Sequence, residues 1–150
     1  MISRAGVTVG EANETNVFSE PEQELLFPAG LLGFGSCHQY KLERFRPDDT
    51  SESPFFMLRA VDQDLSFPLI HPSSIALDYR FPVTPELLTG LRANAADELV
   101  SLLIVTVRDR IEEITVNLQG PLIINPASAL GLQLVIEQYA VRHPLLAREW

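Results

Sequence analysis

The chain has 150 residues, enough for one domain with a sizeable core, and its apolar content of 46% is ordinary for a globular protein. It is acidic, because 20 Asp and Glu outnumber 11 Lys and Arg for a formal net charge of −9. Such a charge repels phosphate backbones, which argues against direct nucleic-acid binding and favours basic protein partners.

Cys37 is the one cysteine, so an intrachain disulfide is excluded and a reducing compartment is expected. The first residues contain no apolar signal segment. The uncharged run 114–136 has the length of a membrane span, but prolines, glycines and asparagines interrupt it. We therefore expect a soluble cytoplasmic protein without membrane contact.

The N-terminal part is weakly patterned up to a glycine-rich loop. Residues 1–24 carry five glutamates and need not be ordered beyond a short edge strand at 7–9. The loop 28–35 contains three glycines between apolar residues, and we expect it to fold over the core with Leu31, Leu32 and Phe34 turned inward. The loop lacks the Lys and Ser or Thr of a phosphate-binding loop.

Short strands separated by turns are predicted next. Pro68 places its strand at a sheet edge or a bulge, because proline donates no backbone hydrogen bond. Thr84 can cap a helix that starts with Pro85 and closes at Gly90. The expected segments are a strand end at 25–27, strands at 40–45, 55–61, 65–70 and 78–81, an acidic loop at 47–53 and a turn at 62–64.

An antiparallel meander is predicted for the centre of the chain. Residues 99–107 are apolar on both faces, which is typical of a strand covered on both sides. A charged turn around Asp109 leads to an alternating, half-buried strand at 114–118. Gly120-Pro121 is expected to interrupt the ladder, and 122–124 to resume it as a third strand.

The C-terminal part leaves one choice open. Residues 128–131 predict a turn and 132–136 a strand, although a helix from Ser128 fits the same residues. Residues 139–145 form a tail. The sum is about nine or ten short strands with one or two short helices, which predicts a mainly β fold: a small antiparallel β-barrel-like or sandwich domain spanning residues 1–150.

The sequence offers no constellation typical of catalysis or metal binding. The three histidines lack metal-ligand spacing. Cys37 and His38 would point to opposite sides of an extended chain, so they do not form a nucleophile–base pair, and Cys37 suits the core. Asp62 and Asp64 are explained by turn chemistry. We expect no enzyme activity and no cofactor.

A protein-binding module remains. Its candidate contacts are the turn that carries Asp109, Glu112 and Glu113, and the acidic loop 48–52. The alternative is that both are solvated surface turns.

Six stretches in order resemble the flagellar assembly factor FliW family. Each motif alone is weak, but together they extend over about residues 25–145. His71 stands where the family usually has asparagine, and residues 1–24 match poorly. The stretches are 27–34 (FPAGLLGF), 54–58 (PFFML), 64–72 (DLSFPLIHP), 78–81 (DYRF), 117–125 (NLQGPLIIN) and 139–145 (YAVRHPL).

The resemblance implies a small cytoplasmic β-barrel-like protein without catalytic activity. Proteins of this family bind flagellin as chaperones and bind the RNA-binding regulator CsrA, which relieves repression of flagellin translation. Flagellin and CsrA compete for the protein, which is a monomer when free. The alternative is a small-ligand-binding protein or an enzyme that shares only the scaffold.

The motif residues can be either interface or structural residues. The loop motif residues can hold the loop shape, with Phe34 in the core. The remaining motif residues can form an interface or a structural clasp. The first set is Phe27, Pro28, Gly30, Gly33 and Phe34, and the second is Asn117, Pro121, Asn125, Arg142, His143 and Pro144.

Overall fold

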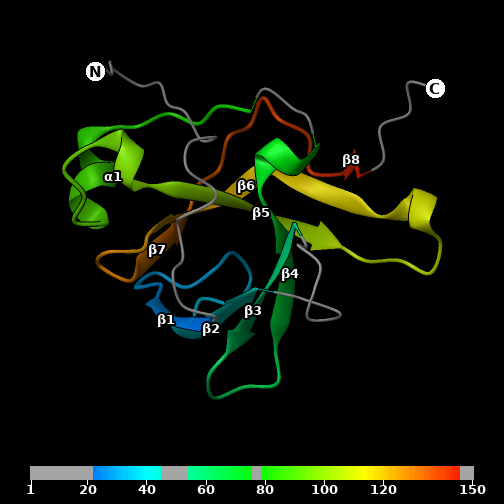
Figure 1. Ribbon diagram of the computed structural model, residues 1–150, viewed down its shortest axis with the longest axis horizontal. Helices are drawn as coiled ribbons and strands as arrows, with labels where there is room; N and C mark the ends of the chain where they lie inside the picture. The colour runs from blue at the N-terminus through cyan, green and yellow to red at the C-terminus, as the bar shows by residue number, and fades with distance from the viewer. Residues whose placement is uncertain (1–21, 45–53, 76–78, 146–150) are drawn as a thin grey trace.

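The computed structural model describes residues 22–44, 54–75 and 79–145 and is built mainly from β-strands (Figure 1). Within these residues there are eight strands, one short α-helix, α1 (Pro85–Gly90), and three 3-10 turns, at Pro72–Ile75, Ala96–Glu98 and Ile111–Glu113. The strands are β1 (Glu22–Leu26), β2 (Gln39–Arg44), β3 (Phe55–Ala60), β4 (Ser66–Ile70), β5 (Val100–Thr106), β6 (Thr115–Asn125), β7 (Leu130–Gln133) and β8 (His143–Pro144).

Seven of the strands close into a barrel. They pair in the order β5-β4-β3-β2-β1-β7-β6, and β6 pairs back with β5, while β8 adds to β6 from outside the ring. The mainly β, barrel-like prediction is confirmed. The antiparallel prediction is wrong at one seam, where β1 runs parallel to β7 and Leu26 lies opposite Leu130. Closure leaves few free strand edges in the described sheet.

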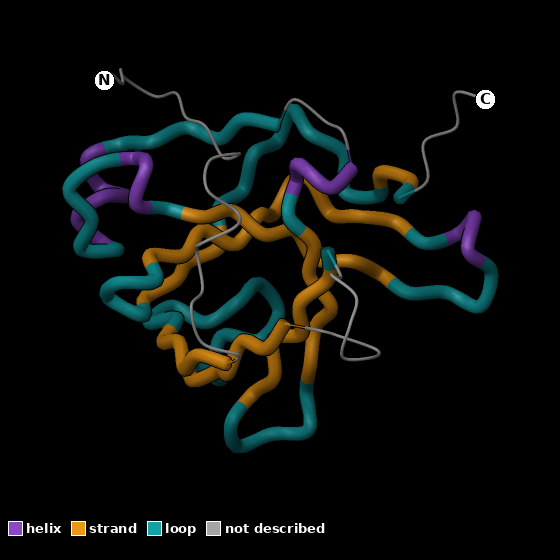
Figure 2. Tube along the Cα trace, in the orientation of Figure 1, coloured by secondary structure: helices purple, strands orange, loops and turns teal. Residues whose placement is uncertain are grey.

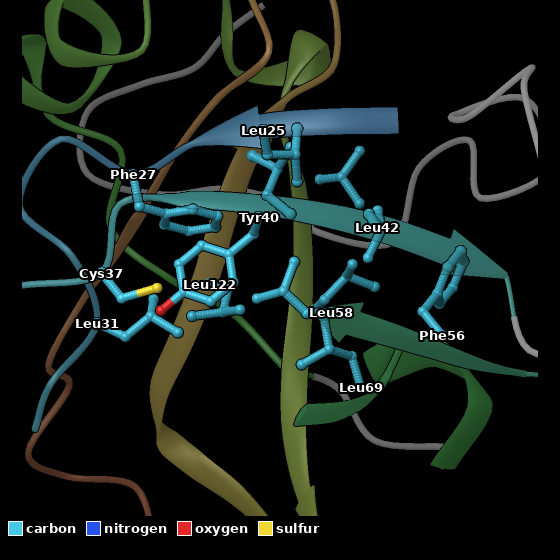
Figure 3. Close-up of a cluster of buried hydrophobic side chains, with 13 residues drawn as sticks. Leu25, Phe27, Leu31, Cys37, Tyr40, Leu42, Phe56, Leu58, Leu69 and Leu122 are labelled. Atoms are coloured by element: carbon cyan, nitrogen blue, oxygen red, sulfur yellow. The ribbon is translucent and has the colours of Figure 1, made fainter. Parts of the chain in front are cut away.

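The inside of the barrel is filled by one apolar cluster (Figure 3). Side chains from β1 to β6 meet there, because alternate residues of each strand point inward. Phe27 and Tyr40 lie at its centre, both 0% exposed, with their rings edge-to-face at 5.5 Å between centroids. Cys37 belongs to this cluster, so its expected place in the core is confirmed.

A second apolar cluster lies on the outer face of β5 and β6 and is covered by α1 and by the segment 79–83. This second layer explains why 99–107 is apolar on both faces: Leu102 points into the barrel and Leu103 into the outer cluster. The doubly covered strand is confirmed as β5. Val107 is an exception, since it lies beyond the strand end and is 62% exposed.

Residues 115–125 form one strand, so the prediction of a separate strand at 122–124 is wrong, whereas the predicted interruption of the ladder at Gly120-Pro121 is present in the pairing with β5. The reason is a shift of register: Ile104 of β5 lies opposite Asn117, whereas Leu102 lies opposite Leu122. The intervening residues of β6 form a bulge against β5, where the ladder does not need the hydrogen bond that proline cannot give.

Three segments differ from their predictions because contacts with distant parts of the chain decide their structure. Residues 79–81 make no ladder; their alternation arises because Tyr79 and Phe81 pack into the outer cluster while Arg80 is exposed. β7 is earlier than the predicted strand 132–136 and follows a turn at 126–129, so the helix alternative is wrong. Part of the expected tail pairs with β6 as β8.

The predictions for the start of the helix and for the position of Pro68 rest on local sequence signals, and both are confirmed. Thr84 caps α1, with its Oγ1 accepting a hydrogen bond from the Leu87 N–H at 3.1 Å, and Pro85 is the first helical residue. Gly90 lies inside the helix, which Leu91 caps. Pro68 pairs with Met57 on one side, and pairing with β5 begins only at Leu69, which confirms an edge-like position.

Some predictions fall outside the described residues: the strand at 7–9, the loop at 47–53 and most of the segment 1–24. Of that segment, Glu22 to Glu24 belong to β1 and pair with β2.

Candidate protein-interaction surfaces

Among the residues that the structure describes, no group of three or more His, Cys, Asp or Glu could hold a metal ion. Cys37 is buried and His38 is exposed, which is the opposed orientation expected for neighbours on an extended chain. The candidate sites are therefore surfaces, and they fall into four regions: the β5–β6 turn, the two asparagines of β6, the glycine-rich loop and the C-terminal strand.

The predicted acidic turn lies at the far tip of the β5–β6 hairpin, where the chain makes a 3-10 turn (Figure 2). Asp109, Glu112 and Glu113 are all exposed. Arg110 lies among them, with its Nη2 3.1 Å from Glu112 Oε2 and its Nε 3.9 Å from Glu113 Oε2. Exposed ion pairs contribute little stability, so these carboxylates remain available to a partner. Arg108 and Arg110 nevertheless make the tip less acidic than its carboxylates alone indicate.

Asn117 holds the bulge of β6. Its Oδ1 accepts hydrogen bonds from the backbone N–H groups of Gln119 and Gly120, at 2.9 and 3.0 Å. These two donors lie where β6 is out of register with β5, so the side chain replaces ladder partners. This geometry favours the structural clasp over the interface for Asn117.

Asn125 fastens α1 to the barrel. Its side chain is buried, with 1% exposure, and its Nδ2 donates to the carbonyl oxygens of Leu91 at 2.8 Å and Arg92 at 3.3 Å. Its Oδ1 accepts from the Ala127 N–H at 3.1 Å. Arg92 has a positive φ of 55°, and these bonds hold the carbonyls at the end of the helix. The geometry again favours a structural clasp.

The glycine-rich loop is tight, but it presents apolar side chains to solvent. Gly30 has φ +72°, and a Cβ there would lie 2.7 Å from the Gly35 Cα. Leu31 is buried, whereas Leu32 is 60% and Phe34 39% exposed, so the inward orientation predicted for these two, and the core position of Phe34, are wrong. The turn that bonds Phe34 N–H to the Leu31 carbonyl at 2.8 Å puts Leu32 at the tip.

Of the other loop residues, Phe27 has the packing of a structural residue. Phe27 fills the core, and a Cβ on Gly131 would lie only 2.6 Å from its ring. Pro28 and Gly33 are exposed, and Gly33 has φ +85°. Phe34 rests its ring on Phe67, with 5.3 Å between centroids.

Gln133 is a structural residue that the sequence did not reveal. Its Oε1 accepts from the Leu32 N–H at 2.8 Å, and its Nε2 donates to the Gly120 carbonyl at 2.9 Å. The side chain thereby joins the glycine-rich loop to the bulge of β6, two of the family motifs. A glutamine in a short strand gives no sequence signal for this role.

The C-terminal motif lies beside the start of β6. His143 lies opposite Val116 and Pro144 opposite Thr115, while Arg142 is exposed. The fold therefore brings Arg142 and His143 to the strand that follows the acidic turn. It does not bring Asn125 or the glycine-rich loop there; Pro121 is buried in the bulge of β6.

An apolar pocket of about 230 Å³ lies near the same end of β6. The sequence gives one signal for it, because the run 55–58 is apolar on both faces, as 99–107 is. That run predicted a strand but not a pocket. The lining residues are Phe55, Phe56, Met57, Pro68, Val105, Val107, Ile114 and Leu145.

Two buried tyrosines have perturbed ionisation. Burial raises the pKa of Tyr79, and the neighbouring Tyr139 adds to the effect. The Tyr79 hydroxyl donates to the Leu118 carbonyl at 2.6 Å, and its ring stacks on that of Tyr139 at 4.7 Å between centroids. Burial also raises the pKa of Tyr40, whose hydroxyl points towards Cys37 (Figure 3). Tyr40 belongs to the cluster inside the barrel and Tyr79 to the outer cluster.

The family model of the FliW protein matches residues 10–145. The chain belongs to the FliW family. It is 35% identical over 139 residues to the flagellar assembly factor FliW of Natranaerobius thermophilus, covering 90% of this chain and 85% of that protein. It is 31% identical over 129 residues to the FliW of Thermoanaerobacter pseudethanolicus, covering 84% of each chain.

A crystal structure of the flagellar assembly factor FliW has the same fold, with a TM-score of 0.71, 28% identity and coverage of 85% of this chain and 88% of that one. The family resemblance found in the motifs is thereby confirmed. The family match begins at residue 10, so it includes much of the segment in which the motifs were poorly matched. Among the described residues, no helix has the length and apolarity needed to cross a membrane.

Proposed function

We propose that this FliW-family protein, a single domain of 150 residues, binds flagellin as a chaperone and binds the translational regulator CsrA, relieving repression of flagellin synthesis. The observation that carries the proposal is the family match over residues 10–145. The protein acts in the cytoplasm, is a monomer when free and binds one partner at a time. It has no catalytic activity, no cofactor and no direct contact with nucleic acid.

The electrostatics support a protein partner that itself binds RNA. A net charge of −9 repels RNA and attracts a basic surface. The same charge therefore argues against direct RNA binding and favours association with a basic protein. The exposed tip of the β5–β6 hairpin, with Asp109, Glu112 and Glu113, is the surface that we propose for CsrA. Arg142 and His143, beside the same end of β6, extend it.

The packing argues against a small-ligand-binding barrel. Proteins of that kind hold their ligand in a cavity lined by apolar groups with a few convergent polar ones. Here the apolar cluster fills the inside of the barrel, and the residues that line the apolar pocket lie outside that cluster except for Phe56, which belongs to both. Its lining residues offer no polar or titratable side chain.

The test is direct binding of the purified chain to flagellin and to CsrA, each measured by isothermal titration calorimetry at low and physiological salt. We expect a saturable complex with each, and a CsrA affinity that falls as salt rises, because screening weakens attraction between charged surfaces. No complex with either protein at both salt concentrations would contradict the proposal.

The hairpin tip can be tested separately with Glu112→Lys together with Glu113→Lys. The change leaves Arg108 and Arg110 beside two added lysines, so we expect a clear loss of CsrA affinity with little change in stability. The matched control is Asp97→Lys with Glu137→Lys, which makes the same charge change at exposed positions elsewhere. Equal loss in both double variants would assign the effect to net charge and remove the tip as the CsrA surface.

A further inference from the structure

Strands β4 and β5 are paired over two residues each and then separate (Figure 1). The outermost pair joins Leu69 to Ile104, and in the described sheet no pairing continues towards the start of β4 or the end of β5. The next pair in this register would join Val105 to Pro68. Because proline has no N–H to donate, the ladder ends there. The last part of β5 therefore pairs with β6 alone.

The hydrogen bonds of the β5–β6 hairpin show which way its main-chain groups point. The Ile114 carbonyl accepts from the Leu145 N–H at 2.9 Å, on the side of β6 that faces away from β5. Main-chain groups of successive residues point to alternate sides, so those of Thr115 point to β5, where Thr106 lies opposite. Val107 follows Thr106, so its N–H and carbonyl point away from β6. The described residues provide no strand partner for them.

The apolar pocket of about 230 Å³ lies beside this free edge. Val105 and Val107 contribute to it from β5 and its end, and as alternate residues they share one face. Met57 and Pro68 contribute from β3 and β4, where they lie opposite each other. All eight lining side chains are apolar. A cavity of about 150 Å³ takes a benzene ring, so this larger space is sufficient for an aromatic or large aliphatic side chain.

The charge beside the pocket suits a basic segment. Val107 and Ile114 of the lining are the residues on either side of the hairpin tip. The exposed carboxylates of the tip are those of Asp109, Glu112 and Glu113. Two arginines of the tip offset part of this charge, but the whole chain carries a net charge of −9. A segment with lysine or arginine is therefore attracted, whereas an acidic one is repelled.

We propose that an extended segment of a basic partner protein docks here, pairs with the free edge at Val107 and places one apolar side chain in the pocket. A strand added to a sheet edge gains affinity from main-chain hydrogen bonds and specificity from pockets for its alternate side chains. The unpaired edge requires an extended backbone, the lining an apolar side chain and the charge a basic residue beside it. This inference does not depend on flagellin or CsrA as the partners.

The probe is a synthetic peptide of seven residues, in which lysine alternates with valine and phenylalanine takes the central position. Isothermal titration calorimetry should show a saturable 1:1 complex. Replacing the phenylalanine by alanine should weaken binding at least about tenfold, because a large apolar side chain is no longer buried. A peptide of the same composition without the alternation is the control and should bind more weakly. No complex with the alternating peptide at about 1 mM would overturn the proposal.

Methylated peptide nitrogens distinguish strand addition from docking through side chains alone. In an extended peptide the lysine nitrogens point to one edge, and those of the apolar residues point to the other. Two isomers, each methylated at one of these sets, keep every side chain. Only one edge meets β5, so one isomer should lose about tenfold or more in affinity and the other should bind like the parent peptide. Equal affinity, or equal loss, in both isomers would contradict the proposal.

Val107→Pro tests the edge from the side of the protein. It removes an N–H that points away from β6, so the hairpin should persist while peptide affinity falls about tenfold or more. Val107→Thr is the matched control, because it keeps the N–H and the β-branched shape, and it should bind within about threefold of the parent protein. Equal affinities of the two variants, with circular dichroism showing that both are folded, would contradict the proposal.

Hydrogen exchange gives the same answer without a substitution. In the free protein the Val107 amide should exchange faster than the Thr106 amide, which pairs with β6. Binding of the alternating peptide should slow the exchange of Val107 several-fold and leave that of Thr106 nearly unchanged. If Val107→Pro does not fold, this measurement decides. A Val107 amide whose exchange the bound peptide does not slow would overturn the proposal.

Discussion

The two apolar clusters of this protein differ in how they are enclosed. The cluster inside the barrel is surrounded by paired strands, and residues such as Tyr40, Leu58 and Leu122 have no exposed surface. The outer cluster is covered by α1 and by irregular segments, which side-chain hydrogen bonds hold in place. The first cluster therefore depends on strand pairing, and the second on a few polar clasps. We expect variation between related proteins, and contacts with partners, to concentrate in the outer layer.

Two adjacent leucines of β5 allow the sharpest comparison, because Leu102 faces the barrel and Leu103 the outer cluster, and both are 0% exposed. Leu→Ala in a core costs about 2–5 kcal/mol, and the cost rises when the surroundings cannot collapse. We expect Leu102→Ala to lie at the upper end and Leu103→Ala at the lower end, measured by urea unfolding. The reverse order would show that the outer layer is the more rigid one.

Asn125→Ala should loosen the outer layer with less effect on the barrel. It removes the bonds to the Leu91 and Arg92 carbonyls and to the Ala127 N–H, which costs about 1–3 kcal/mol, although the Leu91 carbonyl keeps the Ser128 Oγ as a partner at 2.8 Å. Hydrogen exchange should rise first in α1 and the turn after it. The exposed Asn94→Ala is the control and should stay close to the parent protein. Uniform acceleration of exchange throughout the barrel would contradict the separation of the layers.

High pH should weaken the outer layer through Tyr79. Because its pKa is higher in the folded than in the unfolded chain, its stabilising contribution is complete below about pH 10, the ordinary tyrosine pKa, and is lost as the pH rises through the raised value. The urea midpoint should therefore fall above pH 10. Tyr79→Phe should show a smaller fall, leaving the part due to Tyr40. Identical slopes for the parent and the variant would exclude Tyr79 as a cause.

The smallest effect is expected where the outer layer is open. Val107→Ala removes methyl groups from a side chain that is 62% exposed, so its effect on stability should stay within about 0.5 kcal/mol. A melting temperature close to that of the parent is the expected result. A loss comparable to that of Leu103→Ala would mean that Val107 is covered more completely than the described residues show.

The sequence was sufficient where the structure is decided locally. The apolar run of β5 indicated its two covered faces, and Thr84-Pro85 indicated the start of α1. Patterns decided by distant partners were not predictable in the same way. The continuity of β6 through Pro121 depends on the register of β5, and the exposure of Leu32 depends on the geometry of its turn. The alternation at Tyr79 and Phe81 indicated a strand, although packing alone produces it.

The candidate surfaces were predictable to a lesser degree. The exposed turn with Glu112 and Glu113 was identified from its charges, but its pairing with Arg110 requires three-dimensional structure. Asn117 and Asn125 were recognised as motif residues, and only the hydrogen bonds distinguish a clasp from an interface. The apolar pocket depends on five segments that meet only in the fold, so the apolar run 55–58 indicates a strand with two apolar faces but not the pocket.

The central claim, that one protein exchanges two partners, is tested most directly by displacement. CsrA carrying a fluorescent label is first bound to the purified chain, and unlabelled flagellin is then added while anisotropy is followed. The account predicts that flagellin releases CsrA completely. Because the two proteins compete, the apparent affinity of flagellin for the chain should fall as the concentration of free CsrA is raised. Stable binding of both proteins at once, with undiminished anisotropy at saturating flagellin, would contradict it.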